Sequence, residues 1–144
     1  MTVNEFISAI TQRGALTTAP ATEQQITLLN AALRQNRFAM LPRAMIDLYT
    51  ITGSLNLDTG YIFGPIEIMR NGVFPIPDIL TINNDIAPLG KTNGMTIFGR
   101  NDLFWFAFNA FGQFFMLDNL TLKPLRKYDD PYRAMIDCLI AGKF

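Results

Sequence analysis

The sequence predicts a single α+β domain in which an antiparallel β-sheet of about four to six strands packs against N-terminal helices and one C-terminal helix. Three observations predict this class. Amphipathic helical patterns occupy both ends of the chain, strand-like alternation lies between them, and residues 99–118 form an aromatic hairpin with six of the twelve phenylalanines and the only tryptophan. A chain of 144 residues can bury a core without disulfides or metals, so the domain is expected to span residues 1–144.

Two helices that open with capping boxes are predicted near the N-terminus. In a capping box the N-cap hydroxyl and the side chain three residues later each bond the other residue's backbone N–H. The two boxes are Thr2 with Glu5 and Thr22 with Gln25. The first helix is expected to end near Gly14 and the second near Asn36, with a linker over residues 16–21.

A third helix and the C-terminal helix complete the helical set. Pro42 suits the first position of the third helix, because no backbone N–H is needed there, and Gly53 is predicted to be its left-handed stop. Residues 129–131, Asp-Asp-Pro, are interpreted as the cap of the last helix rather than as a catalytic carboxylate pair. That helix is expected to close at Gly142, with Cys138 as a small buried apolar residue.

Short strands are predicted over residues 61–63, 66–68, 95–98 and 122–126, in addition to the aromatic hairpin. The segment 74–90 is rich in proline, asparagine and aspartate, and is predicted to be an ordered loop that contains a helical turn.

The aromatic hairpin presents two faces with different roles. Residues 109–112, Asn-Ala-Phe-Gly, form its turn. Alternate phenylalanines of the first strand share the face that is interpreted as core: Phe104, Phe106 and Phe108. Trp105 lies on the other face with Phe115 and Leu117 of the return strand. Those three residues are either core beneath a second layer of helices or an exposed aromatic anchor for a partner.

Composition excludes several functional classes. The chain has no histidine and one cysteine, which rules out His-dependent nucleophilic triads, histidine zinc sites and thiolate clusters. Twelve acidic and twelve basic residues argue against nucleic acid as the main ligand. No apolar run is long enough to span a membrane and no secretory signal is evident, so a cytoplasmic protein is expected. Residues 44–90 carry five acids and one base, a segment that is either a solvated face or a surface for a basic partner.

Two polar segments are candidate contacts for a protein partner. The first contains Asn83, Asn84 and Asp85, which form either a turn capped by their own side chains or a loop that offers hydrogen bonds and negative charge. In the second, Arg100 and Asp102 lie in a tight connection before a strand, where they could also place a charged pair at the rim of a binding patch. Trp105 completes the candidate set.

The order of several short motifs resembles a known family. The chain has a leucine-proline helix opening with a glycine after the helix, then a glycine, a polar turn, an aromatic-alanine-aromatic strand and a hairpin that ends in an acid. The residues concerned are Leu41, Pro42, Tyr49, Gly53, Gly99, Asp102, Phe106, Ala107, Phe108 and Asp118. They resemble the SUKH superfamily, which includes the yeast cell-wall synthesis regulator domain and many bacterial immunity proteins. The resemblance is strongest over residues 24–142. In one departure, residues 52–54 are Thr-Gly-Ser where Asn-Gly-Gly is usual.

This resemblance implies a non-catalytic bacterial immunity protein that binds and neutralises a cognate polymorphic or contact-dependent toxin domain. It implies a protein partner, no nucleic acid or membrane, no cofactor and no metal, and it leaves the oligomeric state open. Two alternatives remain. One is a regulatory or scaffold protein of the same fold that binds an endogenous protein. The other is a small enzyme or ligand-binding protein that uses carboxylates, which a deep cavity with two converging acids would favour.

Overall fold

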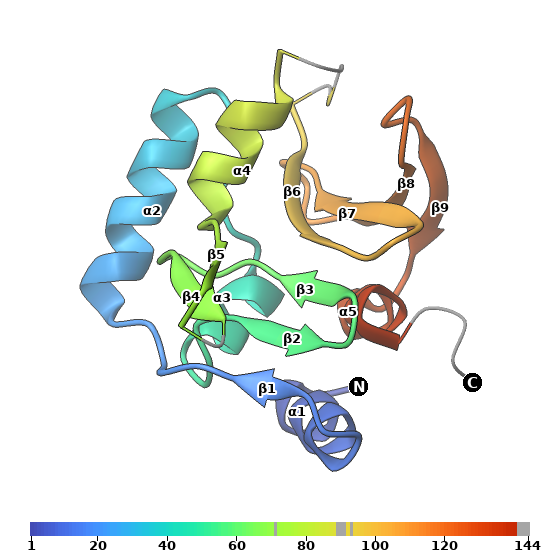
Figure 1. The fold of residues 1–144 in the computed structure, drawn as a ribbon. Coiled ribbons are helices and arrows are strands. Elements are labelled where there is room, and N and C mark those ends of the chain that lie inside the picture. The colour runs from blue at the N-terminus through green and yellow to red at the C-terminus, as the bar shows by residue number, and fades with distance from the viewer. Residues whose placement is uncertain (71, 89–91, 93, 141–144) are drawn as a thin grey trace.

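A computed structural model describes residues 1–70, 72–88, 92 and 94–140. This part of the chain contains five α-helices, a seven-stranded antiparallel sheet and a two-stranded sheet (Figure 1). The predicted α+β class is therefore confirmed. The main sheet has more strands than the expected four to six because two very short strands, β1 and β2, extend one edge.

Helices lie near both ends of the chain, and most of the strands lie between them. The helices are α1 (Val3–Gln12), α2 (Glu23–Gln35), α3 (Arg43–Tyr49), α4 (Ile79–Ile86) and α5 (Pro131–Ile140). The main sheet contains, in spatial order, β1 (Leu16–Thr17), β2 (Leu55–Leu57), β3 (Gly60–Ile62), β6 (Thr96–Arg100), β7 (Phe104–Phe108), β8 (Phe114–Asp118) and β9 (Pro124–Tyr128). A separate hairpin pairs β4 (Ile68–Arg70) with β5 (Phe74–Ile76).

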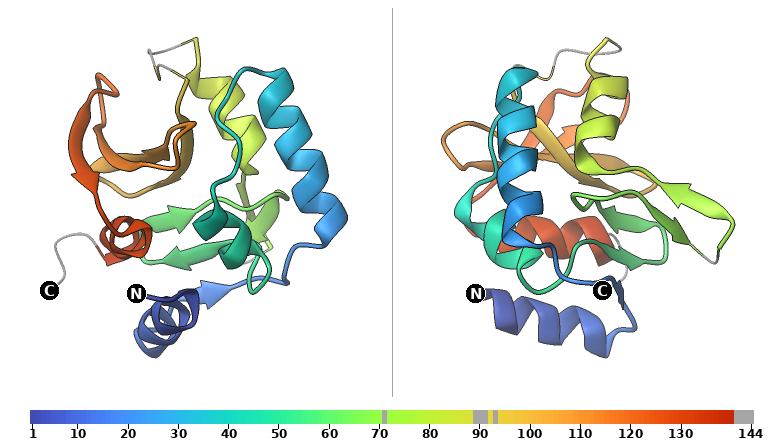
Figure 2. Two further views of the ribbon diagram at one scale, coloured as in Figure 1. Left: turned by 180° about the vertical axis from the view of Figure 1, so that it is seen from behind. Right: turned by 90° about the vertical axis from the view of Figure 1, so that its left-hand side faces the viewer.

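The sheet curls strongly, and helices cover it from different sides. In Figures 1 and 2, β6 to β9 form a curved wall, α2 and α4 stand side by side, and α5 lies against the sheet. Helix α5 contacts β2, β3 and β6 to β9, while α4 contacts α2 and β6. Among the described helices, none has the length and apolar character needed to cross a membrane.

The capping boxes are confirmed fully for α2 and in part for α1. The N–H of Gln25 bonds Oγ1 of Thr22 at 3.1 Å, and the N–H of Thr22 bonds Oε1 of Gln25 at 2.9 Å. Thr2 accepts a bond from the N–H of Glu5, but the Glu5 carboxylate accepts the Thr2 hydroxyl proton in place of the backbone N–H. The predicted end of the first helix agrees with the left-handed Gly14, whose φ is +91°.

Three expectations about the segments around α3 are wrong. Residues 16–21 are not only a linker, because Leu16–Thr17 forms β1 on the edge of β2, a strand too short to show a period in the sequence. Pro42 is the N-cap of α3 rather than its first residue. Gly53 is not the left-handed stop of that helix. An added Cβ at Gly53 would lie 2.8 Å from the carbonyl oxygen of Ala19, so close approach of two backbones is what requires the glycine.

The segment predicted as a loop over residues 74–90 contains β5 and the two-turn helix α4, and residues 89 and 90 lie outside the described part. Asp78 caps this helix by accepting the N–H of Thr81 at 3.1 Å. The buried positions of α4 are Ile79, Asn83 and Ile86. Because an asparagine occupies the central one, the apolar periodicity that announces a helix is interrupted.

The remaining strand predictions differ mainly in their bounds. The strand expected over 66–68 begins two residues later, as β4 of the separate hairpin, and the one expected over 122–126 is β9. The sequence pattern missed β2, which is only three residues long. Asp130 caps α5 by accepting the N–H of Tyr132 at 3.0 Å, as predicted. The expected stop at Gly142 lies outside the described residues.

Aromatic rings from the predicted hairpin form the centre of the core. Phe106 and Phe108 are fully buried, and their ring centres lie 6.3 and 6.2 Å from that of Phe98. Phe114 packs edge-on against Phe98 at 5.3 Å. Phe104, at the open end of β7, is half-buried. The interpretation of the phenylalanine row as core is therefore confirmed for its two inner members.

The predicted turn of the hairpin and the burial of the cysteine are also confirmed. Oδ1 of Asn109 accepts the N–H groups of Phe111 and Gln113, both at 3.0 Å, and Gly112 has a φ of +74°. Cys138 is fully buried in α5, and burial raises the pKa of its thiol. A Cβ added at Gly99 would lie only 2.7 Å from the Sγ of Cys138. The absence of a side chain at Gly99 therefore lets α5 approach the sheet closely.

Asp118 closes the turn between β8 and β9, and its hydrogen bonds lead us to expect that the stability of the fold falls in acid. Its Oδ1 accepts the N–H groups of Leu120 and Thr121, both at 2.8 Å. The bond from Thr121, followed by that from Leu120, lowers the pKa of Asp118 below its ordinary value of 3.8. Because the folded pKa is the lower one, this contribution to stability is complete above the unfolded pKa and is lost as pH falls through the folded pKa.

We expect wild-type protein to lose more stability than Asp118→Asn as the pH falls from about 5 to about 2. Asparagine keeps an oxygen that can accept both N–H groups, but it does not titrate over this range. Chemical denaturation of both proteins across a pH series measures the difference. Parallel stability profiles for the two proteins would show that this carboxylate does not contribute to the acid response.

Candidate functional site

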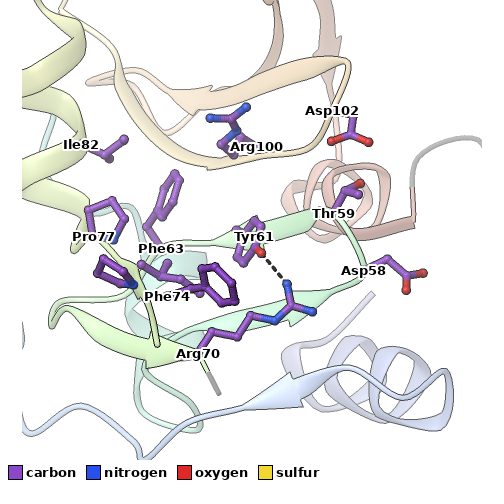
Figure 3. Close-up of a pocket in the computed structure, with 12 residues that line it drawn as sticks. Asp58, Thr59, Tyr61, Phe63, Arg70, Phe74, Pro77, Ile82, Arg100 and Asp102 are labelled. Atoms are coloured by element: carbon purple, nitrogen blue, oxygen red, sulfur yellow. Dashed lines mark hydrogen bonds between the residues drawn. The ribbon is translucent and has the colours of Figure 1, made fainter. Parts of the chain in front are cut away.

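A surface pocket of about 640 Å³ lies between β3, β6, the β4–β5 hairpin and α4 (Figure 3). We call it the two-arginine pocket. Its apolar lining comes from Phe63, Phe74, Pro75, Ile76, Pro77 and Ile82. Its polar lining comes from Asp58, Thr59, Tyr61, Arg70, Arg100 and Asp102.

The apolar wall is held in place by buried contacts beneath it. Phe63 follows β3 and is 2% exposed, whereas Phe74 on β5 is 62% exposed and stands at the open side. The hydroxyl of the buried Tyr49 donates to the carbonyl oxygen of Phe63 at 2.6 Å, and burial raises the pKa of Tyr49. The N–H of Ile79 bonds the carbonyl of Gly64 at 2.9 Å, which joins the start of α4 to the same segment. The wall is therefore positioned by the core and not by the loops alone.

A row of three side chains crosses the sheet at the polar side of the pocket. Arg100 on β6 pairs in register with Trp105 on β7 and with Tyr61 on β3, which places the three side chains on one face of neighbouring strands. The guanidinium carbon of Arg100 lies 4.6 Å from the Trp105 ring centre, a cation–π contact. The sheet register therefore places Arg100 between two aromatic residues, and its guanidinium contacts the ring of Trp105.

The second arginine reaches the same row from the β4–β5 hairpin. Nη1 of Arg70 donates to the hydroxyl of Tyr61 at 2.6 Å, and its guanidinium carbon lies 5.8 Å from the ring centre (Figure 3). Arg70 also pairs in register with Phe74, so both side chains lie on the face of the hairpin that lines the pocket. Within the described ranges, no ion pair joins either Arg70 or Arg100 to a carboxylate. The pocket therefore holds two guanidinium groups that form no ion pair with an aspartate or glutamate in the part of the chain that the structure describes.

The acids of the pocket lie at one end of it. Figure 3 shows Asp58 and Asp102 beside Thr59, at the end away from Ile82 and Pro77. Asp58 belongs to the connection between β2 and β3, and Asp102 belongs to the connection between β6 and β7. The described residues contain no group of three or more acids and cysteines arranged to hold a metal ion.

The structure brings half of the predicted contact residues together. Arg100 and Asp102 line the pocket, and Trp105 contacts Arg100. Between them, Asn101 is buried and its Oδ1 accepts the N–H groups of Leu103 and Phe104 at 2.8 and 2.9 Å. This segment is thus both a tight connection before a strand and a charged rim, so the two interpretations of it are compatible.

The other three predicted residues lie on α4 and do not line the pocket. Asn83 is 1% exposed, so the prediction that it contacts a partner is wrong. Its amide bonds the backbone: Nδ2 donates to the carbonyls of Ile79 and Ile97 at 2.7 and 2.8 Å, and Oδ1 accepts the N–H of Ile97 at 2.7 Å. Asn84 and Asp85 are exposed on the helix.

The proposed three-residue aromatic anchor on the second face of the hairpin does not exist as one exposed patch. Leu117 is fully buried, while Trp105 and Phe115 are half-buried. Four of the large exposed apolar side chains instead lie on and beside the β4–β5 hairpin: Ile66, Met69, Val73 and Phe74, which are 51%, 55%, 66% and 62% exposed. Others are spread over the surface, among them Phe111 and Leu120 in the turns that follow β7 and β8, each 88% exposed.

Sequence reasoning missed the contribution of this hairpin because β5 falls in the segment predicted as a loop. One signal pointed to it: Arg70 is the single base among five acids in residues 44–90. Comparison of the chain with models of protein families, with characterised proteins and with solved structures gives no match. The grounds for a functional proposal are therefore the pocket, the surface around it and the resemblance of the motifs.

Proposed function

We propose that this protein is a non-catalytic immunity protein of the SUKH type, which binds and neutralises a toxin domain encoded beside it. The observation that carries the proposal is the exposed apolar surface of the β4–β5 hairpin at the mouth of the two-arginine pocket. Exposed apolar groups of this kind, rimmed by charged side chains, mark sites where a protein partner binds.

The hairpin presents this surface away from the rest of the molecule. In the right-hand view of Figure 2 it extends from the body of the protein. Phe74 and Val73 are 62% and 66% exposed, and Leu103 in the β6–β7 connection is 58% exposed. A two-stranded hairpin contributes little stability by itself. The apolar residues of the hairpin that face solvent, unlike its buried Ile76, are therefore better explained by contact with a partner than by support of the fold.

The shape and charge of the pocket favour recognition over carboxylate catalysis. Two guanidinium groups occupy its polar side, and its acids, Asp58 and Asp102, lie at one end on separate connections. Carboxylate-based catalysis needs two acids that converge on a substrate from which water is excluded. The specific role of immunity comes from the resemblance, whose motifs supply Gly99 beside α5, Asp102 at the pocket and Asp118 at the β8–β9 turn.

The test is co-expression with the genes that lie next to this one. We expect the protein to restore growth to a bacterial host that expresses a neighbouring toxin domain, and to bind that domain directly when both are purified. Phe74→Ser should weaken the binding by about 1 to 3 kcal/mol, the usual cost of losing an apolar anchor. Leu28→Ser, at an α2 side chain that is also 62% exposed, is the matched control.

Failure of wild-type protein to rescue growth with any adjacent toxin-like gene would contradict the immunity role. Specific binding to an endogenous protein, with no toxin gene nearby, would instead support the regulatory or scaffold role. Equal losses of binding for Phe74→Ser and Leu28→Ser would show that the partner does not use the hairpin.

A further inference from the structure

We propose that the two-arginine pocket binds a carboxylate side chain of the partner protein, together with an apolar side chain next to that carboxylate in the partner. This inference rests on the proposed function, because it takes the partner to be a protein. It goes further by naming the chemistry through which the partner is recognised.

The charge of the pocket is complementary to a carboxylate. Arg70 and Arg100 line the same pocket, and neither forms an ion pair with an acid of the described residues. Their present contacts are with aromatic groups: the Tyr61 hydroxyl for Arg70 and the Trp105 ring for Arg100. A guanidinium group has five N–H donors in a planar fork that matches the two oxygens of a carboxylate. Most of these donors are not used by the contacts that hold the two groups.

The two guanidinium groups are held before a partner arrives. Tyr61 pairs in register with Arg100 and accepts the 2.6 Å bond from Arg70, so it orders Arg70 beside the strand that carries Arg100. The cation–π contact with Trp105 restricts Arg100 from the other side. Side chains that are already ordered lose less conformational entropy on binding. Each guanidinium is therefore ordered before an acid of the partner binds.

The distribution of the other lining residues orients the ligand. Asp102 lies at one end of the pocket and repels a second negative charge there, whereas Pro77 and Ile82 lie at the other end (Figure 3). An apolar group attached to the bound carboxylate is directed toward Pro77, Ile82 and the exposed ring of Phe74. Asp102 also disfavours a polyanion such as nucleic acid, whose phosphates bind lysine and arginine side chains.

The surroundings favour a segment of a protein over a free small molecule. Small-molecule sites enclose most of the ligand surface. This pocket opens instead beside the exposed Phe74 and Val73 of the hairpin, so a bound segment would contact both the pocket and the apolar surface next to it.

The chain contains a built-in reporter of this binding. Trp105 is the only tryptophan of the sequence, and its ring contacts the guanidinium of Arg100. A carboxylate that binds Arg100 changes the electrostatic environment of the indole. Emission from Trp105 therefore follows occupancy of the pocket without any label.

The first arm of the test uses capped tetrapeptides of sequence Ala-Phe-Glu-Ala, with glutamine or lysine in place of glutamate in two controls. Binding is followed by Trp105 emission and by NMR chemical shifts of the pocket residues. We expect the glutamate peptide to bind at least about tenfold more tightly than the glutamine peptide, the usual effect of a charge-assisted bond, and the lysine peptide to bind weakest. Equal binding of the three peptides would overturn the proposal.

Matched arginine variants test whether the guanidinium groups are responsible. Arg70→Gln and Arg100→Gln should each weaken binding of the glutamate peptide about tenfold or more. Arg43→Gln removes an exposed arginine of α3 that pairs with Asp47 away from the pocket, and it should leave the affinity unchanged. Circular dichroism and thermal unfolding establish that the variants fold. Unchanged affinity in both pocket variants would also overturn the proposal.

The second arm separates this inference from the proposed function. With a toxin that wild-type protein neutralises, Arg70→Gln and Arg100→Gln should lose protection while Arg43→Gln keeps it. Full protection by both pocket variants would refute the inference and leave the immunity role intact. Charge-dependent peptide binding, combined with no rescue from any adjacent gene, would support the pocket chemistry and refute the immunity role.

Discussion

Asn83→Asp is expected to lower the free energy of unfolding by about 3 kcal/mol or more, because it places an unpaired charge in the core and removes two hydrogen-bond donors. Asn83 is 1% exposed, and its Nδ2 donates to the carbonyls of Ile79 and Ile97 at 2.7 and 2.8 Å. In the variant, a carboxylate oxygen would face those carbonyl oxygens and repel them. A loss of this size is a large part of the stability of an ordinary domain.

The structural role of Asn83 explains why the effect should be so large. Strand β3 pairs with β6 at Gly99 and Arg100. On this edge of β6, no strand of the described residues pairs with the backbone of Ile97. The amide of Asn83 supplies both missing bonds, since Nδ2 reaches the Ile97 carbonyl and Oδ1 accepts its N–H at 2.7 Å. One side chain of α4 thus stands where a further strand residue would be. It also fixes the helix that carries Ile82 into the pocket.

The neighbouring residue gives a control with the same chemical change. Asn84 is exposed on α4, so Asn84→Asp adds a charge to the same helix without burying it. Surface substitutions of this kind usually change stability by less than about 0.5 kcal/mol. Urea denaturation of both variants provides the comparison. If the two variants unfold at the same urea concentration, the amide of Asn83 does not hold the sheet edge.

Asn83 also shows where the sequence pattern fails. Amphipathic helices at both ends and the aromatic hairpin were predictable because their apolar residues recur at the period of the element. Helix α4 was not, since its central buried position holds an amide whose bonding partners, Ile79 and Ile97, lie in two different elements. A polar residue satisfied by tertiary contacts looks the same in the sequence as one in a loop. The same segment contains β5, which the sequence pattern did not predict, and β5 forms one wall of the pocket.

The candidate site was predictable only in the part that lies on the hairpin. Arg100, Asp102 and Trp105 stand out in the sequence because they lie within the aromatic segment of residues 99–118, and the structure places all three at or beside the pocket. Arg70 and Tyr61 are nine residues apart in chain order, and their 2.6 Å bond depends on how the β4–β5 hairpin folds back toward β3. Local spacing carries no information about that contact.

Gly64→Ala is expected to destabilise the protein by about 4 kcal/mol or more, a size typical of severe steric clashes. An added Cβ at Gly64 would overlap the carbonyl oxygen of Gly53 and lie 2.6 Å from its carbon atom. Both atoms belong to the backbone, so no flexible side chain can move away. The segments that meet there carry other necessary bonds, from Gly53 N–H to Ala19 at 3.0 Å and from Ile79 N–H to Gly64 at 2.9 Å. Relief of the clash would have to break at least one of them.

The consequence for the site follows from the neighbours of Gly64. Phe63 forms the buried wall of the two-arginine pocket, and its carbonyl accepts the Tyr49 hydroxyl at 2.6 Å. Separation of this segment from Gly53 would shift Phe63 and the start of α4 together. Gly64→Ala should therefore lose ligand binding along with stability, unlike the arginine variants, which should lose binding alone.

Gly14→Ala separates the steric clash from the general cost of replacing a glycine. Gly14 has a φ of +91°, but a Cβ built there meets no atom of the described residues within 4 Å. Its replacement therefore costs only the backbone strain of a left-handed residue, about 1 kcal/mol. Thermal and urea unfolding of both variants should place Gly64→Ala well below Gly14→Ala in stability. If Gly64→Ala were no less stable than Gly14→Ala, the close contact between Gly53 and Gly64 would not be a requirement of the fold.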